Sequence, residues 1–499
     1  MNNGYKKFLQ DVGLTFLTSI VNVIIAFPIS IILGRYLGVG ELGLYRMVTT
    51  IYGVCILFAT MGIPASVIKY VAEFQKNNAQ VTRIISSSMY ISILLGVISF
   101  LIIYLSADLI GNLFNMRELP QLIRTISIVF PFSVTCSTML GVLNGFRDMK
   151  IYSLISISQN ILMLLITLIF ILLGYGVVGV VNGIVISNIC ISIYLLWKLR
   201  NYFIKISFFQ IINNSKILLN FGIKTVMGNS VILINYYADT LMIGYFLTQE
   251  AVGVYSVAVI LSQFLWLIPD SIQKITYPTI SEYHGNKRNE EINQIVTKTM
   301  RYTTCILIII GFIALIYAKY AIELIYGDSF GESIKPFYIL LIGTIIFGIV
   351  KSISSVFAAI GRTDLFVKIP TISAILNILL NFLLIPIYGT TGAAIATATS
   401  LCVYSAIMVY YIKKLLRVSF DINWYTKTLV LTAFLIIIND ITMGISRIHV
   451  PKMIIAFLGI ILICSYLLTS DEKKYLYDAA YKSKQAVCQF FCKIKDTYM

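Results

Sequence analysis

The chain has 499 residues, of which 58% are hydrophobic and only 12% are charged. A soluble domain carries about 25% charged residues, so this composition excludes an ordinary water-soluble fold and requires lipid around much of the chain. The excess of 38 basic over 22 acidic residues would suggest a nucleic-acid-binding protein if the chain were soluble. In a membrane protein the excess of basic residues is explained by their concentration in the inner loops, so no nucleic-acid partner is expected.

Apolar stretches long enough to cross a hydrocarbon core predict an all-α polytopic membrane protein with 14 transmembrane helices. The first stretch follows Lys6 and Lys7 and is longer than the core of a signal peptide, so we expect it to be retained. In chain order the predicted spans are 12–33, 47–68, 84–105, 122–144, 151–174, 177–197, 221–247, 251–270, 302–318, 336–360, 365–387, 390–412, 428–444 and 453–469.

The basic residues orient these spans. With the N-terminus inside, 29 of the 38 fall in inner loops and tails, 8 fall in outer loops, and Lys351 lies within a span. This bias predicts a multi-pass protein of the cytoplasmic membrane with both termini in the cytoplasm. The stretch 198–220 mixes bases with aromatic residues, as an amphipathic helix on the inner surface does.

Two pairs of segments repeat at nearly constant offsets. Residues 34–45 match 244–255 at an offset of 210, and residues 175–187 match 388–400 at an offset of 213. We therefore predict two parallel-repeat six-helix lobes around a central cavity, followed by two C-terminal helices. The boundaries are 1–212 for the N-terminal lobe, 213–415 for the C-terminal lobe, 416–470 for spans 13 and 14, and 471–499 for a cytoplasmic amphipathic tail. Transporters with internal repeats bind substrate where the repeats meet and alternate access by rocking.

Four motifs, in this order along the chain, resemble the polysaccharide transporter family of the multidrug/oligosaccharidyl-lipid/polysaccharide superfamily. They are the glycine turn at 35–45, the segment 62–74, the segment 239–244 with Gly253-Val-Tyr255, and the segment 277–283. The resemblance covers the whole chain and implies a flippase, not an enzyme, that takes part in cell-surface polysaccharide biosynthesis. The implied substrate is an isoprenoid-diphosphate-linked glycan in the membrane lipid. Polysaccharide-assembly membrane proteins are the implied partners.

Two ionisable residues lie at predicted membrane depth, where a charge costs at least about 2.5–3.5 kcal/mol. Asp239 in span seven is either a cavity acid that takes a proton or Na⁺ or helps to release the anionic lipid, or a structural hydrogen-bonding group. Lys351 in span ten either attracts the diphosphate as a point charge or extends to the inner headgroups on its long stem.

Other basic residues lie at predicted span ends. Arg35 and Arg46 flank the outer turn of the first half and are either diphosphate ligands or interfacial anchors. Lys69, Lys224 and Arg301 lie at inner ends, where they could receive the diphosphate, although the positive-inside bias also accounts for them.

Neutral polar residues within the spans complete the set of cavity candidates. They could bind sugar hydroxyls, but helix packing in membranes uses the same residue types. The five are Asn22, Gln159, Asn235, Gln263 and Asn377.

Competing functions remain open at this point. An ion-coupled multidrug or organic cation antiporter and a lipid II flippase belong to the same superfamily. A membrane enzyme would need paired acids in sizeable outer loops, and no phosphate-cradling GxxxxGK[ST] motif is present. With two histidines, His284 and His449, we expect no metal site, and no cofactor other than a coupling H⁺ or Na⁺.

Overall fold

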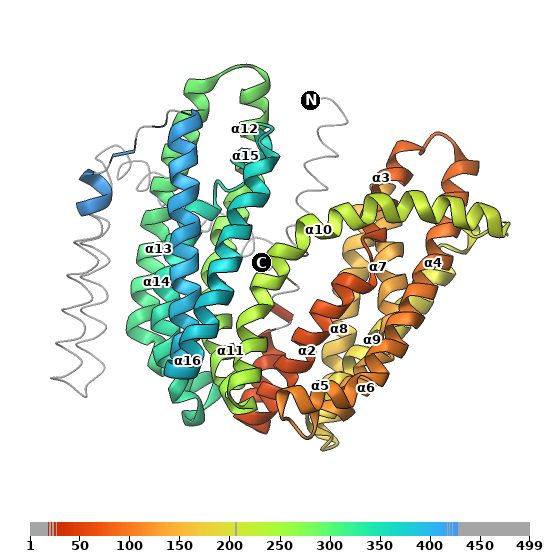
Figure 1. Ribbon diagram of the computed structural model, residues 1–499, viewed down its shortest axis with the longest axis horizontal. Coiled ribbons are helices and arrows are strands. Elements are labelled where there is room, and N and C mark those ends of the chain that lie inside the picture. The colour runs from red at the N-terminus through yellow and green to blue at the C-terminus, as the bar shows by residue number, and fades with distance from the viewer. Residues whose placement is uncertain are drawn as a thin grey trace, which may run out of the picture.

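The computed structural model describes residues 27–204 and 207–416, together with positions 18, 21, 24, 25, 418, 420, 421 and 423–427 (Figure 1). All regular secondary structure within these residues is helical, which confirms the all-α prediction for this part of the chain. Half of the first predicted span, the thirteenth and fourteenth spans and the tail 471–499 lie outside the described residues.

The helices form two groups that lie on opposite sides of Figure 1. The N-terminal group follows the π-helical turn Leu33–Leu37 and contains α2 (Val39–Ala59), α3 (Ile63–Glu73), α4 (Asn78–Leu105), α5 (Ala107–Phe114), α6 (Leu119–Ser127), α7 (Phe130–Gly145), α8 (Met149–Leu172) and α9 (Gly176–Lys198). The C-terminal group contains α11 (Gln249–Gln263), α12 (Leu267–Gly285), α13 (Asn289–Tyr326), α14 (Ile334–Lys351), α15 (Val356–Ala359) and α16 (Thr363–Leu416). The helix α10 (Phe208–Phe246) runs between the two groups.

Within the described residues, eight helices are long and apolar enough to cross a membrane, and α6 with α7 forms a ninth candidate bent by 48°. The predicted count of 14 is therefore not confirmed. Helix α16 counts once, although Gly389 (φ 59°, ψ −137°) divides it between the predicted eleventh and twelfth spans. The eighth span is longer than predicted, because its helices continue to Gly285.

The outer surface of these helices is apolar. On α8 the side chains of Leu154, Leu165, Ile169 and Leu172 are all more than half exposed. Continuous apolar surface of this kind needs lipid rather than water around it. The largest buried cluster joins the two groups, since Leu42 and Met47 of α2 belong to it together with Val252 of α11. The chain is thus a multi-pass membrane protein.

Helix α2 begins earlier than the hydropathy pattern predicts. Gly38 (φ 90°) ends the preceding turn, and the helix starts at Val39, so Arg46 lies within a helix and does not flank a turn. Glu41 in the first turn accepts a hydrogen bond of 3.2 Å from the backbone N–H of Val177, at the start of α9. A carboxylate at a helix N-terminus accepts a hydrogen bond from an otherwise unpaired backbone N–H group. It also interacts favourably with the positive end of the helix dipole. Charged residues that suggested a loop are therefore part of the helical structure.

The two groups meet where α2 crosses α11, and the contact is reciprocal. A Cβ added to Gly43 would overlap the backbone oxygen of Gln249, and a Cβ added to Gly253 would overlap that of Val39. Each contact maps onto the other at the offset of 210 that relates the repeated sequences. Self-complementary contacts of this type arise when two copies are related by a two-fold axis. Glycine is needed here because it allows two backbones to approach closely.

Helix α10 is anchored at both ends, to different groups. Near its start, the hydroxyl of Ser66 in α3 donates a 2.6 Å hydrogen bond to the backbone oxygen of Leu218, and Gly62 lies against Gly222 without room for a side chain. Near its end, Asp239 accepts hydrogen bonds from Asn381 and Thr397 of α16. Residues 208–220 of the predicted surface segment 198–220 form one uninterrupted helix with the predicted seventh span.

Candidate functional site

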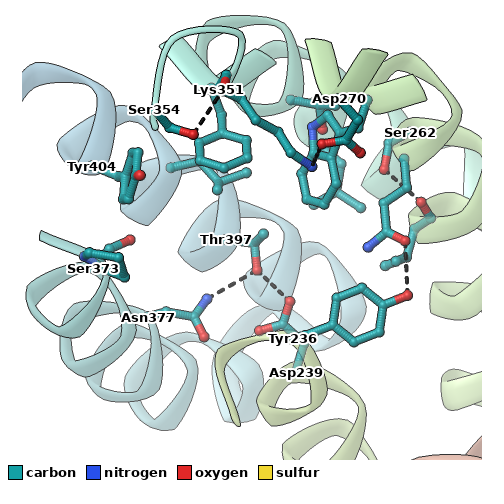
Figure 2. A pocket seen from close by; sticks show the side chains of 18 of the residues that line it. Tyr236, Asp239, Ser262, Asp270, Lys351, Ser354, Ser373, Asn377, Thr397 and Tyr404 are labelled. Carbon is teal, nitrogen blue, oxygen red and sulfur yellow. Dashed lines mark hydrogen bonds and ion pairs between the residues drawn. The ribbon is translucent and has the colours of Figure 1, made fainter. Parts of the chain in front are cut away.

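A cavity of about 520 Å³ lies within the C-terminal group. Its lining comes from residues 236–404, on α10, α11, α12, α14, α16 and the turn at Trp266. The predicted cavity lay between the two lobes, whereas this one is enclosed by helices of a single group together with α10. The cavity brings together four of the predicted residues, which are Asp239, Gln263, Lys351 and Asn377 (Figure 2).

Asp239 is buried, with 7% of its surface exposed, and accepts three hydrogen bonds. The Tyr255 hydroxyl donates to Oδ2 at 2.6 Å, the Asn381 amide donates to Oδ1 at 2.7 Å, and the Thr397 hydroxyl also donates to Oδ2. Three donors on one carboxylate match the acceptor capacity of its ionised form. The surrounding helices thus compensate the loss of water around this buried acid.

The donors to Asp239 are themselves linked through the side-chain amide of Asn377. The Asn377 amide donates to the Thr397 hydroxyl at 3.1 Å, and the Asn381 amide donates to the side-chain oxygen of Asn377 at 3.1 Å. The side-chain oxygen of Asn381 is buried and has no partner within the described part of the chain. Carboxylate, amide and hydroxyl oxygens therefore converge around Asp239, and one buried acceptor is unused.

Lys351 lies at the other side of the same cavity and is paired. Its Nζ atom is 2.9 Å from Asp270 Oδ1 and 4.4 Å from the centre of the Trp266 ring. The side chain of Lys351 is 19% exposed and that of Asp270 is 43% exposed, and both residues line the cavity. Lys351 is held in place by an acid and an aromatic ring, and it does not extend freely towards the headgroups.

Neutral polar contacts connect the two charged clusters around the cavity. The hydroxyl of Tyr236 donates to Gln263 Oε1 at 3.1 Å, and Figure 2 shows this contact beside Asp239. Near Lys351, the Gln273 amide donates to the hydroxyl of Ser354 at 2.7 Å. The lining thus alternates between donors and acceptors of hydrogen bonds.

Gln159 lies elsewhere, in a hydrogen-bonded network within the N-terminal group. Its amide donates to Asn188 Oδ1 at 3.0 Å, the hydroxyl of Ser133 donates to the same oxygen at 2.9 Å, and Tyr52 donates to Ser133 at 2.9 Å. Four helices, α2, α7, α8 and α9, are joined by these bonds. This is the pattern of interhelical packing by polar residues in membranes.

Replacing Gln159 with leucine will therefore lower stability slightly and leave transport unchanged. An interhelical hydrogen bond in a membrane contributes about 0.6 kcal/mol on average, and the Ser133–Asn188 bond remains. Thermal unfolding in detergent measures the first effect, and a transport assay in liposomes measures the second. Loss of transport in a variant that unfolds normally would place Gln159 in the substrate pathway instead.

The predicted arginines of the outer turn lie apart from the cavity. Arg35 is exposed and donates to the backbone oxygen of Leu324 on α13. Arg46 on α2 is half-buried, its guanidinium lies 5.6 Å from the centre of the Tyr45 ring, and its Nε atom has no hydrogen-bond partner among the described residues. Neither residue lines the cavity beside Asp239.

Two of the three predicted entry residues lie on neighbouring helices. The exposed Lys69 of α3 has its Nζ 4.4 Å from the centre of the Phe221 ring of α10, and the exposed Lys224 is one turn further along α10. Arg301 lies on α13, with its guanidinium 5.2 Å from the centre of the Trp424 ring. The structure therefore groups Lys69 with Lys224 and separates them from Arg301.

A second cavity, of about 470 Å³, lies among α3, α4 and α10 near this pair. Arg83, Asn77, Gln80 and Asn214 supply its polar lining. Of the remaining candidates, Asn22 lies outside the described residues. Asn235 belongs to α10, where the structure describes its backbone alone.

Sequence reasoning missed several residues of the main cavity. Tyr255, Asn381 and Thr397 bind Asp239, and Asp270 binds Lys351. One signal was present, because Asn377 and Asn381 are four residues apart and therefore share a helix face. Among the described residues, no group of three or more histidines, cysteines or acids could hold a metal ion.

Comparison with protein families gives two matches. The model described as "Polysaccharide biosynthesis protein" matches residues 8–284, which is more than half of the chain. The MatE model matches residues 225–383, a range that contains Asp239, Asp270 and Lys351.

Individual relatives include flippases. The chain is 27% identical over 290 residues to a Haloferax volcanii protein named "Probable flippase AglR", covering 57% of this chain and 60% of that one. It is 21% identical over 494 residues to lipid II flippase MurJ of Bacillus subtilis, covering 88% of this chain and 86% of the relative. The chain spans about three fifths of the length of the first of these relatives.

A solved structure shares the fold. The structure titled "Lipid II flippase MurJ, inward closed conformation" superimposes with a TM-score of 0.74 at 16% identity, covering 92% of this chain and 98% of that one. At this identity the likeness establishes the arrangement of helices and leaves the substrate to be decided by the residues of the cavity.

Proposed function

Since the chain belongs to the polysaccharide biosynthesis protein family, a polysaccharide transporter family of the multidrug/oligosaccharidyl-lipid/polysaccharide superfamily, we propose that it translocates an isoprenoid-diphosphate-linked oligosaccharide across the cytoplasmic membrane. The observation that carries the proposal is the cavity among membrane helices, with a buried acid on one side and an ion pair on the other. Ionisable groups at membrane depth normally serve a transport pathway.

The proposed mechanism is alternating access by rocking of two lobes related by a parallel repeat. The reciprocal contact of Gly43 with Gln249 and of Gly253 with Val39 supports this symmetry. In the predicted orientation, with both termini in the cytoplasm, this contact lies at the outer end and closes that side. Opening to the outside would then require α2 and α11 to separate, which is the rigid-body motion expected of repeat transporters.

The coupling ion, H⁺ or Na⁺, is proposed to bind at Asp239. The carboxylate supplies a negative charge, while Thr397 and the side-chain oxygens of Asn377 and Asn381 supply neutral oxygens. Hard cations prefer oxygen ligands of this type. Binding of a cation would replace hydrogen bonds from Asn381 and Thr397, which link α10 to α16, and would thereby couple occupancy to the position of α10.

The diphosphate is proposed to enter at Lys69 and Lys224. Two cations on the adjoining α3 and α10 can act together on one anionic group, and the aromatic ring of Phe221 lies beside them. Because the helix α10 continues from this place to Asp239, the loading site and the cavity are on one element.

A second candidate function is ion-coupled export of organic cations. The MatE match includes the whole stretch from Asp239 to Asn381, and the two carboxylates of the cavity would suit a cationic substrate. The two functions differ in the sign of the charge that is moved.

Reconstitution in liposomes separates these functions. We expect the purified protein to move a fluorescent isoprenyl-diphosphate oligosaccharide between leaflets, measured by quenching of the accessible dye, and to leave ethidium unmoved under a proton or sodium gradient. Empty liposomes and liposomes with the Gly43→Val variant, whose added side chain has no room, serve as controls. Ethidium export without movement of any lipid-linked glycan would replace the flippase proposal with the antiporter.

A further inference from the structure

We propose that the cavity of the C-terminal group binds an uncharged saccharide, and that the diphosphate of the same substrate binds outside it. The inference rests on the proposed function only in assigning this saccharide to a lipid-linked molecule. The family match does not say what binds in the space between Tyr236, Gln263, Asp270 and Lys351, and an uncharged saccharide is the ligand proposed there.

The charge of the lining argues against a diphosphate in this cavity. The lining carries one cation, Lys351, and two carboxylates, Asp239 and Asp270. The cation is already neutralised by Asp270 at 2.9 Å. A diphosphate would find no unpaired cation among these lining residues, and placing it beside carboxylates is unfavourable. The same balance disfavours acidic sugars.

The aromatic residues of the lining fit the apolar faces of sugar rings. Tyr236 is 52% exposed, and its hydroxyl is held by Gln263, so one ring is presented in a fixed orientation. Trp266 contacts Phe347 with 5.3 Å between ring centres, and Phe347 contacts Tyr404 at 5.1 Å. Rings that are locked by neighbours give binding area at little entropic cost. A pyranose presents C–H groups on its faces, which pack against such rings.

The polar groups fit the hydroxyls at the edge of the sugar ring. A hydroxyl both donates and accepts, so it is best satisfied where donors and acceptors alternate. Lys351 donates and Asp270 accepts, and the Gln273–Ser354 pair and Gln263 can do both. The Lys351–Asp270 ion pair can bridge neighbouring hydroxyls without being broken. These groups already pair with one another, so sugar hydroxyls would add hydrogen bonds to the donor and acceptor positions that remain unused.

Trp266 provides a direct measurement of binding. The chain has three tryptophans, Trp197, Trp266 and Trp424, and only Trp266 is part of this cavity. In a Trp197→Phe, Trp424→Phe variant the remaining fluorescence reports the cavity, where Lys351 lies 4.4 Å above the indole ring. The probes are uncharged di- and trisaccharides of hexose and N-acetylhexosamine, namely lactose, maltotriose and N,N′-diacetylchitobiose. Inorganic pyrophosphate is the charged comparison.

We expect at least one uncharged saccharide to change the fluorescence saturably, and pyrophosphate to cause no saturable change. Tyr236→Ala should weaken saccharide binding at least tenfold. The matched control is Tyr245→Ala, which removes a tyrosine of the same helix and similar exposure, 54%, from outside the cavity and should leave binding unchanged. Size-exclusion profiles establish that each variant is folded.

The outcomes separate this inference from the proposed function. Saturation by pyrophosphate, or no saturation by any of the saccharides, overturns the saccharide site even when the protein moves the lipid-linked glycan in liposomes. Saturable saccharide binding that Tyr236→Ala abolishes sustains the site even if no lipid is moved, in which case the flippase proposal fails alone.

Discussion

Replacing Asp239 with alanine will abolish ion-driven transport and will also destabilise the protein. The substitution leaves the donors of Tyr255, Asn381 and Thr397 buried without an acceptor. Each buried unsatisfied group costs about 1–3 kcal/mol, so we expect a loss of about 3 kcal/mol or more. The measurements are thermal unfolding in detergent and flipping of a fluorescent isoprenyl-diphosphate glycan under a sodium or proton gradient.

Asp239→Asn distinguishes the role of the charge from that of the shape. It retains the size of the side chain and one acceptor oxygen, which can still accept from Tyr255 and Thr397, while its amide would face the amide of Asn381. We therefore expect it to lower stability less than Asp239→Ala does. Without the negative charge, however, it should lose the dependence of transport on the ion gradient and slow transport at least about tenfold, which corresponds to about 1.4 kcal/mol. If Asp239→Asn transports at the wild-type rate and still responds to the gradient, Asp239 is a structural hydrogen-bonding group and the coupling ion binds elsewhere.

Replacing Gly43 with valine will prevent the contact between α2 and α11 and stop transport. An added Cβ overlaps the backbone oxygen of Gln249, so the two helices must separate. Overpacking of this kind typically costs about 1–3 kcal/mol, and a shift of about 1.4 kcal/mol between two conformations changes their ratio tenfold. We therefore expect the flipping rate to fall at least about tenfold. The repeat-related Gly253→Val should behave in the same way, since its Cβ overlaps the backbone of Val39.

Gly331→Ala and Gly285→Ala are the matched controls for these glycine variants. A Cβ at either position meets no atom within 4 Å, so both should be within about 0.5 kcal/mol of the wild type and transport normally. Normal flipping by Gly43→Val would show that the contact is not closed at any point of the transport cycle.

The features that depend on local sequence were predictable. Apolar stretches located most helices, and the repeated glycines at the offset of 210 turned out to face each other across α2 and α11. Asp239 and Lys351 were recognisable because a charge at membrane depth is costly and therefore rare. The repeat in sequence carried information about a contact between segments that are far apart in the chain.

What was missed depends on the tertiary structure. Asp270 is the last residue of the predicted eighth span, and only the packing of α12 against α14 brings it within 2.9 Å of Lys351. The role of Gln159 could not be read from α8, because that helix is apolar on all sides and its sequence does not indicate which face meets the lipid. Arg46 was assigned to a turn because hydropathy averages treat charged residues as loop, although Glu41 and Arg46 belong to the first turns of α2.

The continuity of α10 has a mechanical consequence. One end of this helix is fixed to α3 by Ser66 and Gly62, and the other is fixed to α16 through Asp239. If the two groups of helices rotate against each other, a rigid α10 cannot keep both of its attachments. Either the helix flexes between Gly222 and Asp239, a length of roughly 25 Å at 1.5 Å per residue, or the attachment at Asp239 is released. A cation that competes for the oxygens of Asp239 would then release the end of α10 that is attached to α16. The other end of α10 would stay attached to α3 through Ser66 and Gly62.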